Sequence, residues 1–171
     1  MALLDILEYP DPRLRLRSAP VTRFDDTVLR LADDLLETLH ASGAIGLSAP
    51  QANDHREVLV MDLSGDASAP QVFVNPRILA SGALGLVQES CVSVPGVVGN
   101  IVRATEVRVR AQTARGETFE RDLDGMEAIC LQHEMDHLAG RLFVDRLSLF
   151  RRLRIRAAAA ARERRGVRAT A

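Results

Sequence analysis

The sequence predicts an α+β fold in which short antiparallel strands pack around a central helix, between an N-terminal helix and an arginine-rich C-terminal helix. Three observations predict it. A helical stripe of apolar residues lies near the N-terminus, several short β-rich runs follow it, and two further helical patterns complete the chain. Strands and helices do not alternate regularly, so the parallel sheet of an α/β fold is not expected.

The first helix is expected from Asp25 to about Ala41. Residues 9–15 precede it and are predicted to be extended or to form a turn, because each proline disfavours helix at the residue before it. The helix ends at Gly43. Its apolar stripe consists of Val28, Leu31, Leu35 and Leu39.

Strands are predicted in the middle of the chain, over residues 57–63, 71–76 and 104–113. In the last of these, two valines alternate with Arg108 and Arg110, which indicates a strand with one solvated face. Residues 43–51 and 64–70 contain glycine, proline or serine and are predicted to be loops.

The second helix is expected from about Gly125 to Ala139, and Gly140 ends it. Asp124 and Glu127 have the spacing of a capping box, with the aspartate as the cap. Residues 141–147 are predicted to be a strand or a turn. The tail is predicted to be helical from Ser148 to about Arg165.

Length and composition limit the class of protein. The 171 residues fit a single domain, which we expect to span residues 1–171 with a basic C-terminal helix and tail over 148–171. The apolar fraction of 47% excludes a disordered chain, and the longest apolar runs fall well short of the ~20 residues that a membrane span needs. The start of the chain lacks a basic region typical of signal peptides, so a cytoplasmic location is expected.

The charged residues exclude further classes. All 22 basic residues are arginine, and the net charge is −1. Arginine does not serve as a neutral amine base, so lysine-based and Schiff-base catalysis are excluded. We expect no membrane partner and no sequence-specific recognition of nucleic acid.

Two histidines on the second predicted helix indicate a metal site. His133 and His137 lie on one helix face, about 6 Å apart along the axis, and their imidazoles can converge on one ion. Glu134 is adjacent to that face and can reach a water on the metal without being a ligand. The alternative is an amphipathic helix with two incidental histidines.

The third ligand is open on local sequence alone. Phe143 occupies the place at which the longer HExxHxxGxxH pattern requires a histidine. Cys130 lies about 10 Å along the axis from His137, so it is expected to be a small apolar residue below the site. Glu163 lies in an arginine-rich, solvated segment, and Cys91 could be either a ligand or a buried structural cysteine.

Three segments in order, GAIGLSAPQ (43–51), ESCVS (89–93) and QHEMDHLAG (132–140), resemble the three signature motifs of peptide deformylase. The resemblance extends over about residues 5–148. It implies hydrolysis of the formyl group from the N-terminal formylmethionine of nascent chains, with release of formate. It also implies one divalent metal ion, natively Fe²⁺ and replaceable by Zn²⁺ or Ni²⁺, held by Cys91, His133 and His137.

The resemblance also implies roles for other residues. Glu134 is the general base and acid, and the oxyanion is bound by the side-chain amide of Gln51 and the backbone N–H of Val92. Gly46 and Leu47 match the loop whose backbone runs beside the bound peptide. Glu89 and Arg103 match an ion pair that steadies the metal loop. The pocket for the methionine side chain aligns with Ile45, Val87, Met126, Ile129 and Cys130.

The sequence departs from the family pattern at four positions. Ala44 replaces a glycine, Ser48 an alanine, and Ser90 the glycine before the metal-binding cysteine. Val98 lies where many relatives have an arginine that faces the substrate. The positions that match metal ligands are intact, so activity is expected.

The end of the chain carries a high positive charge. Residues 141–171 contain ten arginines, opposed by one aspartate and one glutamate. The resemblance implies ribosome binding through this helix, and a solvated helix is the alternative. Two other functions remain open: a metallopeptidase with a different third ligand, and a non-catalytic ribosome-binding relative.

Overall fold

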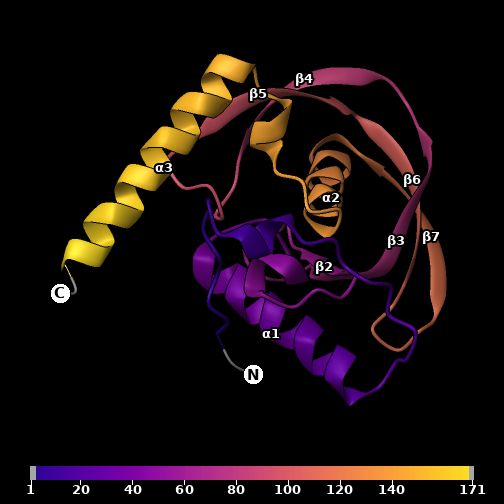
Figure 1. The fold of residues 1–171 in the computed structure, drawn as a ribbon. Helices are drawn as coiled ribbons and strands as arrows, with labels where there is room; N and C mark the ends of the chain where they lie inside the picture. Colours follow the sequence, from indigo (N-terminus) through magenta and orange to yellow (C-terminus); the bar gives the residue numbers. More distant parts are fainter. Residues whose placement is uncertain (1–2, 170–171) are drawn as a thin grey trace.

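The computed structural model describes residues 3–169, and it describes side chains through residue 162. Helix α2 (Gly125–Leu138) lies in the middle of the molecule, and the strands curve around it (Figure 1). Helix α1 (Asp26–Ser42) lies on one side, and α3 (Leu149–Ala169) lies along the outside. The predicted α+β fold with a central helix is confirmed.

The sheets are antiparallel throughout the described chain. One sheet has five strands in the order β1-β2-β3-β6-β7, and the other consists of β4 and β5. The strands of the first sheet are β1 (Gly46–Ser48), β2 (Val58–Met61), β3 (Gln71–Ser81), β6 (Glu106–Gln112) and β7 (Thr118–Asp124). Those of the second are β4 (Leu84–Ser90) and β5 (Val98–Ala104). The described chain also contains three 3₁₀-helices: η1 (Pro12–Arg15) before α1, η2 (Ala49–Ala52) between β1 and β2, and η3 (Phe143–Arg146) between α2 and α3.

Residues next to each end of α1 determine where this helix begins and ends. The side chain of Asp25 accepts a hydrogen bond from the backbone N–H of Thr27 at 3.0 Å and caps the first turn. Gly43 adopts the left-handed conformation at φ 68° and ends the helix, as predicted. The predicted apolar stripe is buried against β1 and β2.

The predicted capping box of α2 is wrong. Asp124 is the N-cap residue, but its side chain makes no capping hydrogen bond. Glu127 instead accepts a hydrogen bond from the side chain of Gln71 on β3 at 2.8 Å. Glu127 therefore binds Gln71, which is distant in sequence, instead of the backbone N–H of Asp124. Gly140 ends the helix at φ 71°, where a side chain would collide with the backbone carbonyl of Arg15.

The predicted strands β2, β3 and β6 are confirmed, and β3 runs five residues beyond the predicted end. In β6, Val107 and Val109 are buried, whereas the two arginines pair with Asp122 and Glu120 of β7. Strands β1, β4, β5 and β7 were not predicted, and β1 lies within residues 43–51, which were predicted to be a loop. The segment 141–147 forms η3 rather than a strand, and 9–15 contains η1.

The core surrounds α2 on most sides. The buried residues of α2 include four polar or charged ones: His133, Glu134, Asp136 and His137. Burying such side chains is costly unless each finds a partner. Among the described residues, no helix combines the length and the apolar character that crossing a membrane requires.

Candidate metal centre and active site

A cysteine and two histidines converge beside α2. Cys91 follows the last residue of β4, and its Sγ lies 3.3 Å from Nε2 of His137. The Nε2 atoms of His133 and His137 are also 3.3 Å apart. All three ligand atoms lie within 4.8 Å of one another. Two nitrogens bound at ~2.0–2.1 Å to one tetrahedral ion would be about 3.3 Å apart, so the cluster fits a metal ion.

The second nitrogen of His133 supports the same interpretation. Its Nδ1 lies 2.8 Å from a carboxylate oxygen of Glu89, which fixes the ring and leaves Nε2 facing Cys91 and His137. Burial lowers the pKa of His137 well below its usual value, and the nearby His133 lowers it further. The neutral imidazole, which is the ligating form, is therefore favoured at His137. At His133 burial also lowers the pKa, but hydrogen bonds with Cys91 and Glu89 outweigh it and raise the pKa well above its usual value.

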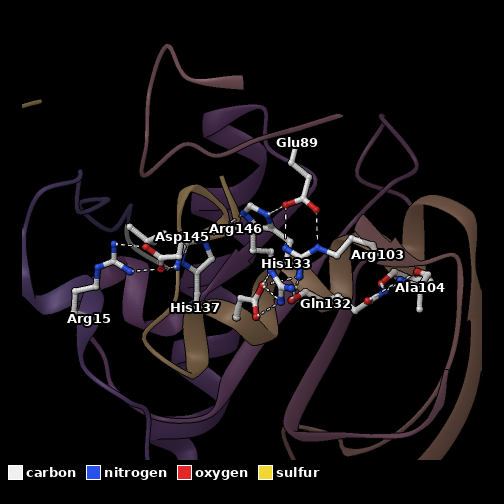
Figure 2. A network of polar contacts seen from close by, with 12 residues as sticks. Arg15, Glu89, Arg103, Ala104, Gln132, His133, His137, Asp145 and Arg146 are labelled. Carbon is white, nitrogen blue, oxygen red and sulfur yellow. Dashed lines mark hydrogen bonds and ion pairs between the residues drawn. The ribbon is translucent and has the colours of Figure 1, made fainter. Parts of the chain in front are cut away.

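Glu89 belongs to a buried network of charged groups (Figure 2). Its carboxylate accepts hydrogen bonds from Arg103 at 2.6 and 3.0 Å, and the Nη1 of Arg103 reaches Asp136 at 2.6 Å. Burial raises the pKa of Glu89, but the hydrogen bonds with His133 and Arg103 outweigh it and lower the pKa to about 2. The predicted pairing of Glu89 with Arg103 is thus present in the structure.

Two members of this network were missed in the sequence. Asp136 lies on α2 between the two histidines, and Arg146 of η3 binds its carboxylate at 2.9 to 3.1 Å. The position of Asp136 inside the histidine motif was the available signal. Arg146 carried no local signal, because its role depends on how η3 folds back on α2.

Glu134 lines a cavity next to the metal-binding cluster. Its side chain is buried, and Oε2 has no hydrogen-bond partner among the described residues. Burial raises the pKa of this carboxyl, and the nearby His133 and Ser48 offset part of the rise. Such a group is suited to accepting a proton near neutral pH.

The absence of a side chain at Gly46 leaves space for the side chain of Glu134. A Cβ at Gly46 would lie 2.6 Å from Sγ of Cys130 and 2.7 Å from Oε1 of Glu134. The backbone at Gly46 does not require glycine by its dihedral angles, so the requirement is steric. The first motif and the HExxH helix therefore meet at atomic contact.

Gln51 is fully buried at the end of η2. Its Nε2 donates to Oγ of Ser93 at 3.1 Å and lies 3.6 Å from Sγ of Cys91. The backbone N–H of Val92 donates to no group among the described residues. Because one N–H of the amide donates to Ser93, the neighbourhood of the thiolate offers the other amide N–H and one backbone N–H to an incoming oxygen.

The cavity has a volume of about 380 Å³. Four of the five residues predicted to form the methionine pocket line it, namely Ile45, Met126, Ile129 and Cys130. The fifth, Val87, is half-buried in β4 and is not part of the lining. Gly46 lines the cavity, whereas the side chain of Leu47 points into the core next to α1.

The four departures from the motifs lie in different surroundings. Ala44 and Ser90 line the cavity, and the side chain of Ser90 is exposed. Ser48 is fully buried and contacts Gln51. The carbonyl of Val98 accepts a hydrogen bond from Arg151 of α3.

The other candidates for third ligand do not join the cluster. Sγ of Cys130 lies 3.6 Å from the carbonyl oxygen of Ile45, and burial raises the pKa of its thiol well above the usual value. Phe143 is buried and stacks on His133, with ring centroids 6.1 Å apart. The side chain of Glu163 lies outside the described residues. Among the described residues, Cys91 is the one that meets both histidines.

Comparisons with known proteins agree on one family. The model of the polypeptide deformylase family matches residues 3–152. A peptide deformylase of Cellvibrio japonicus is 47% identical over 169 residues, which cover 98% of this chain and 100% of the relative. One of Azotobacter vinelandii is 50% identical over 157 residues, covering 91% and 94%. The crystal structure of a peptide deformylase from Legionella pneumophila matches with a TM-score of 0.91 at 39% identity, covering 98% of this chain and 99% of that chain.

Proposed function

This chain belongs to the polypeptide deformylase family, and we propose that Cys91, His133 and His137 hold the divalent metal ion on which its activity depends. The protein is a hydrolase that removes the N-formyl group from nascent polypeptides and releases formate. A divalent ion held there, natively Fe²⁺, would supply Lewis acidity that makes water a stronger nucleophile at neutral pH. The mutual approach of the three ligand atoms carries this proposal.

Glu134 carries the proton in this proposal. Its carboxylate accepts a proton from the attacking water and later donates it to the nitrogen of the departing amine. Its position on the cavity wall, its unpartnered Oε2 and the pKa raised by burial support this role.

Gln51 and Val92 bind the formyl oxygen as negative charge develops on it. The side-chain N–H₂ of Gln51 and the backbone N–H of Val92 are the donors. Each fixed donor of this kind is worth about 3 kcal/mol in comparable acyl chemistry. The full burial of Gln51 supports the role, because a buried donor is already ordered before the reaction.

The methionine side chain occupies the apolar part of the cavity, which is lined by Ile45, Met126, Ile129 and Cys130. The peptide backbone lies along β1, beside Gly46 and Leu47. Strand β1 is the outer strand of the five-stranded sheet, so one edge of it has no strand partner in the described chain. An extended peptide can add to such an edge.

The proposed setting is the bacterial cytoplasm, with the ribosome as a partner of α3. The relatives described above come from bacteria. Four arginines of α3, at 151, 152, 154 and 156, are exposed. Arg154 and Arg156 have no ion-pair partner among the described residues. Such a surface suits the phosphates of RNA.

The proposed metal site is tested with a matched pair of cysteine variants. Cys91→Ala should lose the metal ion and the release of formate from formyl-Met-Ala, measured under anaerobic conditions. Cys130→Ala should keep one metal ion per chain, because its sulfur lies outside the cluster. Metal content by mass spectrometry is the readout. A Cys91→Ala protein that retains its metal and activity would refute the ligand set.

A further inference from the structure

We propose that Ser48 is a positioning residue for Gln51, whose side-chain amide its hydroxyl holds in the orientation that presents N–H₂ to the formyl oxygen. This inference rests on the proposed role of Gln51. It concerns a position at which this chain has a hydroxyl where alanine is usual for the motif. The hydroxyl is not exposed, so it has no role in contacting solvent or a partner.

The contacts around Gln51 form a complete set. Its Oε1 accepts two hydrogen bonds from Ser48, one from the backbone N–H at 2.8 Å and one from Oγ at 2.7 Å. Its Nε2 donates to Oγ of Ser93 and faces Sγ of Cys91. Both ends of the amide are therefore engaged, and all four groups are buried or partly buried.

The opposite orientation of the amide is unfavourable. Rotation by 180° would bring the amide N–H₂ against the backbone N–H of Ser48, so that two donors would face each other. It would also turn the amide oxygen toward the sulfur of Cys91, which is negative when it binds a metal. In that orientation Gln51 would offer the formyl oxygen an acceptor instead of a donor.

The hydroxyl adds to what the backbone N–H provides. A single hydrogen bond to Oε1 leaves the amide plane free to tilt, whereas two donors from different directions fix the plane. Hydrogen bonds in a buried site are also electrostatically stronger than in water.

A purely structural role makes a different prediction. Burying a hydroxyl without a hydrogen bond is costly, and in a purely structural role Gln51 would serve only as the hydrogen-bond partner of Ser48. In that case, removal of the hydroxyl would alter stability without depending on what Gln51 does in the reaction. A double-mutant cycle separates the two roles.

The experiment compares the metal-loaded wild type with Ser48→Ala, Gln51→Leu and the double variant, on formyl-Met-Ala. We expect Ser48→Ala to lower kcat roughly three- to tenfold, the range that one net hydrogen bond supports, with little change in KM. In the Gln51→Leu background the same substitution should have almost no effect. Ser18→Ala is the matched control, because Ser18 is a buried serine whose hydroxyl has no partner among the described residues.

A second readout does not depend on activity. The side-chain N–H₂ resonances of Gln51 should be two sharp, well-separated signals in the wild type, and Ser48→Ala should shift or broaden them while Ser18→Ala leaves them unchanged. An equal loss of kcat in both backgrounds, or unchanged Gln51 resonances, would overturn the role of Ser48. Unchanged turnover in Gln51→Leu would instead refute the proposed role of Gln51 itself.

Discussion

Because Gly46 has no side chain, the first motif can lie in direct contact with α2. Its Cα faces both Cys130 and Glu134, and there is no space for a methyl group at that point. Glycine is therefore required at this position to leave space for the carboxylate of Glu134, and not to form a turn. Glu134 also depends on a single atom, because the unpartnered Oε2 is the oxygen available for its proposed role as proton carrier.

Gly46→Ala should destabilise the protein by about 1–3 kcal/mol and lower kcat, because the new methyl group displaces both neighbours. Adding Cys130→Ala removes the contact with sulfur but leaves the one with Glu134. Chemical denaturation should then show partial recovery of stability, while turnover stays low. Recovery of full turnover in the double variant would contradict the steric account of Glu134.

Glu134→Gln should bind one metal ion per chain and yet lose about 10²–10⁴-fold in kcat, the usual contribution of a positioned proton carrier. The amide has nearly the same shape as the carboxyl but cannot accept the proton. Metal analysis together with formate release measures both effects. Loss of the metal from this variant would mean that Glu134 is a ligand.

At the scale of elements, α2 is a helix whose polar side chains point inward. It tolerates them because β4 and β5 supply Glu89 and Arg103, which engage His133 and Asp136. The two-stranded sheet thus contributes the proposed cysteine ligand at the end of β4, and its two strands contribute Glu89 and Arg103 of the supporting ion pair. Neither α2 nor the β4–β5 pair forms the site without the other.

Arg103→Ala and Arg146→Ala test this dependence. Arg103 is buried, and its removal takes an ion-pair partner from two buried carboxylates, those of Glu89 and Asp136. The free energy of unfolding should fall by about 3–5 kcal/mol. The metal affinity should fall roughly 10–100-fold. The side chain of Arg146 is 43% exposed, so its loss should cost less than about 1 kcal/mol. Denaturation and competition with a metal chelator give the two quantities. Similar costs for both variants would argue against burial as the cause.

At the scale of the whole molecule, α3 lies on the outside of the protein, where Arg151 donates to the carbonyl of Val98 and Arg162 pairs with Glu8. Ile155 is the α3 residue packed in the nearby apolar cluster, whereas Phe150 and Leu153 are exposed. The helix extends along the outside of the molecule (Figure 1). A change of charge on α3 is therefore expected to leave the active site intact.

Arg154→Glu together with Arg156→Glu should weaken co-sedimentation with ribosomes at low salt and leave hydrolysis of formyl-Met-Ala unchanged. The control is Arg17→Glu with Arg30→Glu, which changes the net charge equally at exposed positions outside α3. If both pairs weaken sedimentation to the same degree, net charge alone is responsible. Unchanged sedimentation of the α3 variant would exclude α3 as the docking surface.

Local patterns were enough to predict the helices and part of the sheet. The apolar stripe of α1, the glycines that end α1 and α2, and the alternation in β6 each depend on neighbours within a few residues. Strands β4 and β5 were not predicted, because glycines and exposed leucines and valines obscure the alternation of apolar and polar residues in them. The capping box failed because Gln71, which is distant in sequence, binds Glu127.

The sequence by itself determined the two histidines with the glutamate between them, since a helix brings residues four apart onto one face. Local sequence left the third ligand open, and the resemblance to a family supplied Cys91. Only the tertiary structure decided that its sulfur lies 3.3 Å from His137, that Asp136 and Arg146 extend the network, and that Ser48 engages Gln51. The physical reason is that each of these contacts depends on how elements fold onto one another, which no local pattern encodes. Cys91 and His137 are 46 residues apart. Arg146 reaches Asp136 because η3 folds back on α2, and Ser48 reaches Gln51 because η2 turns the chain between them.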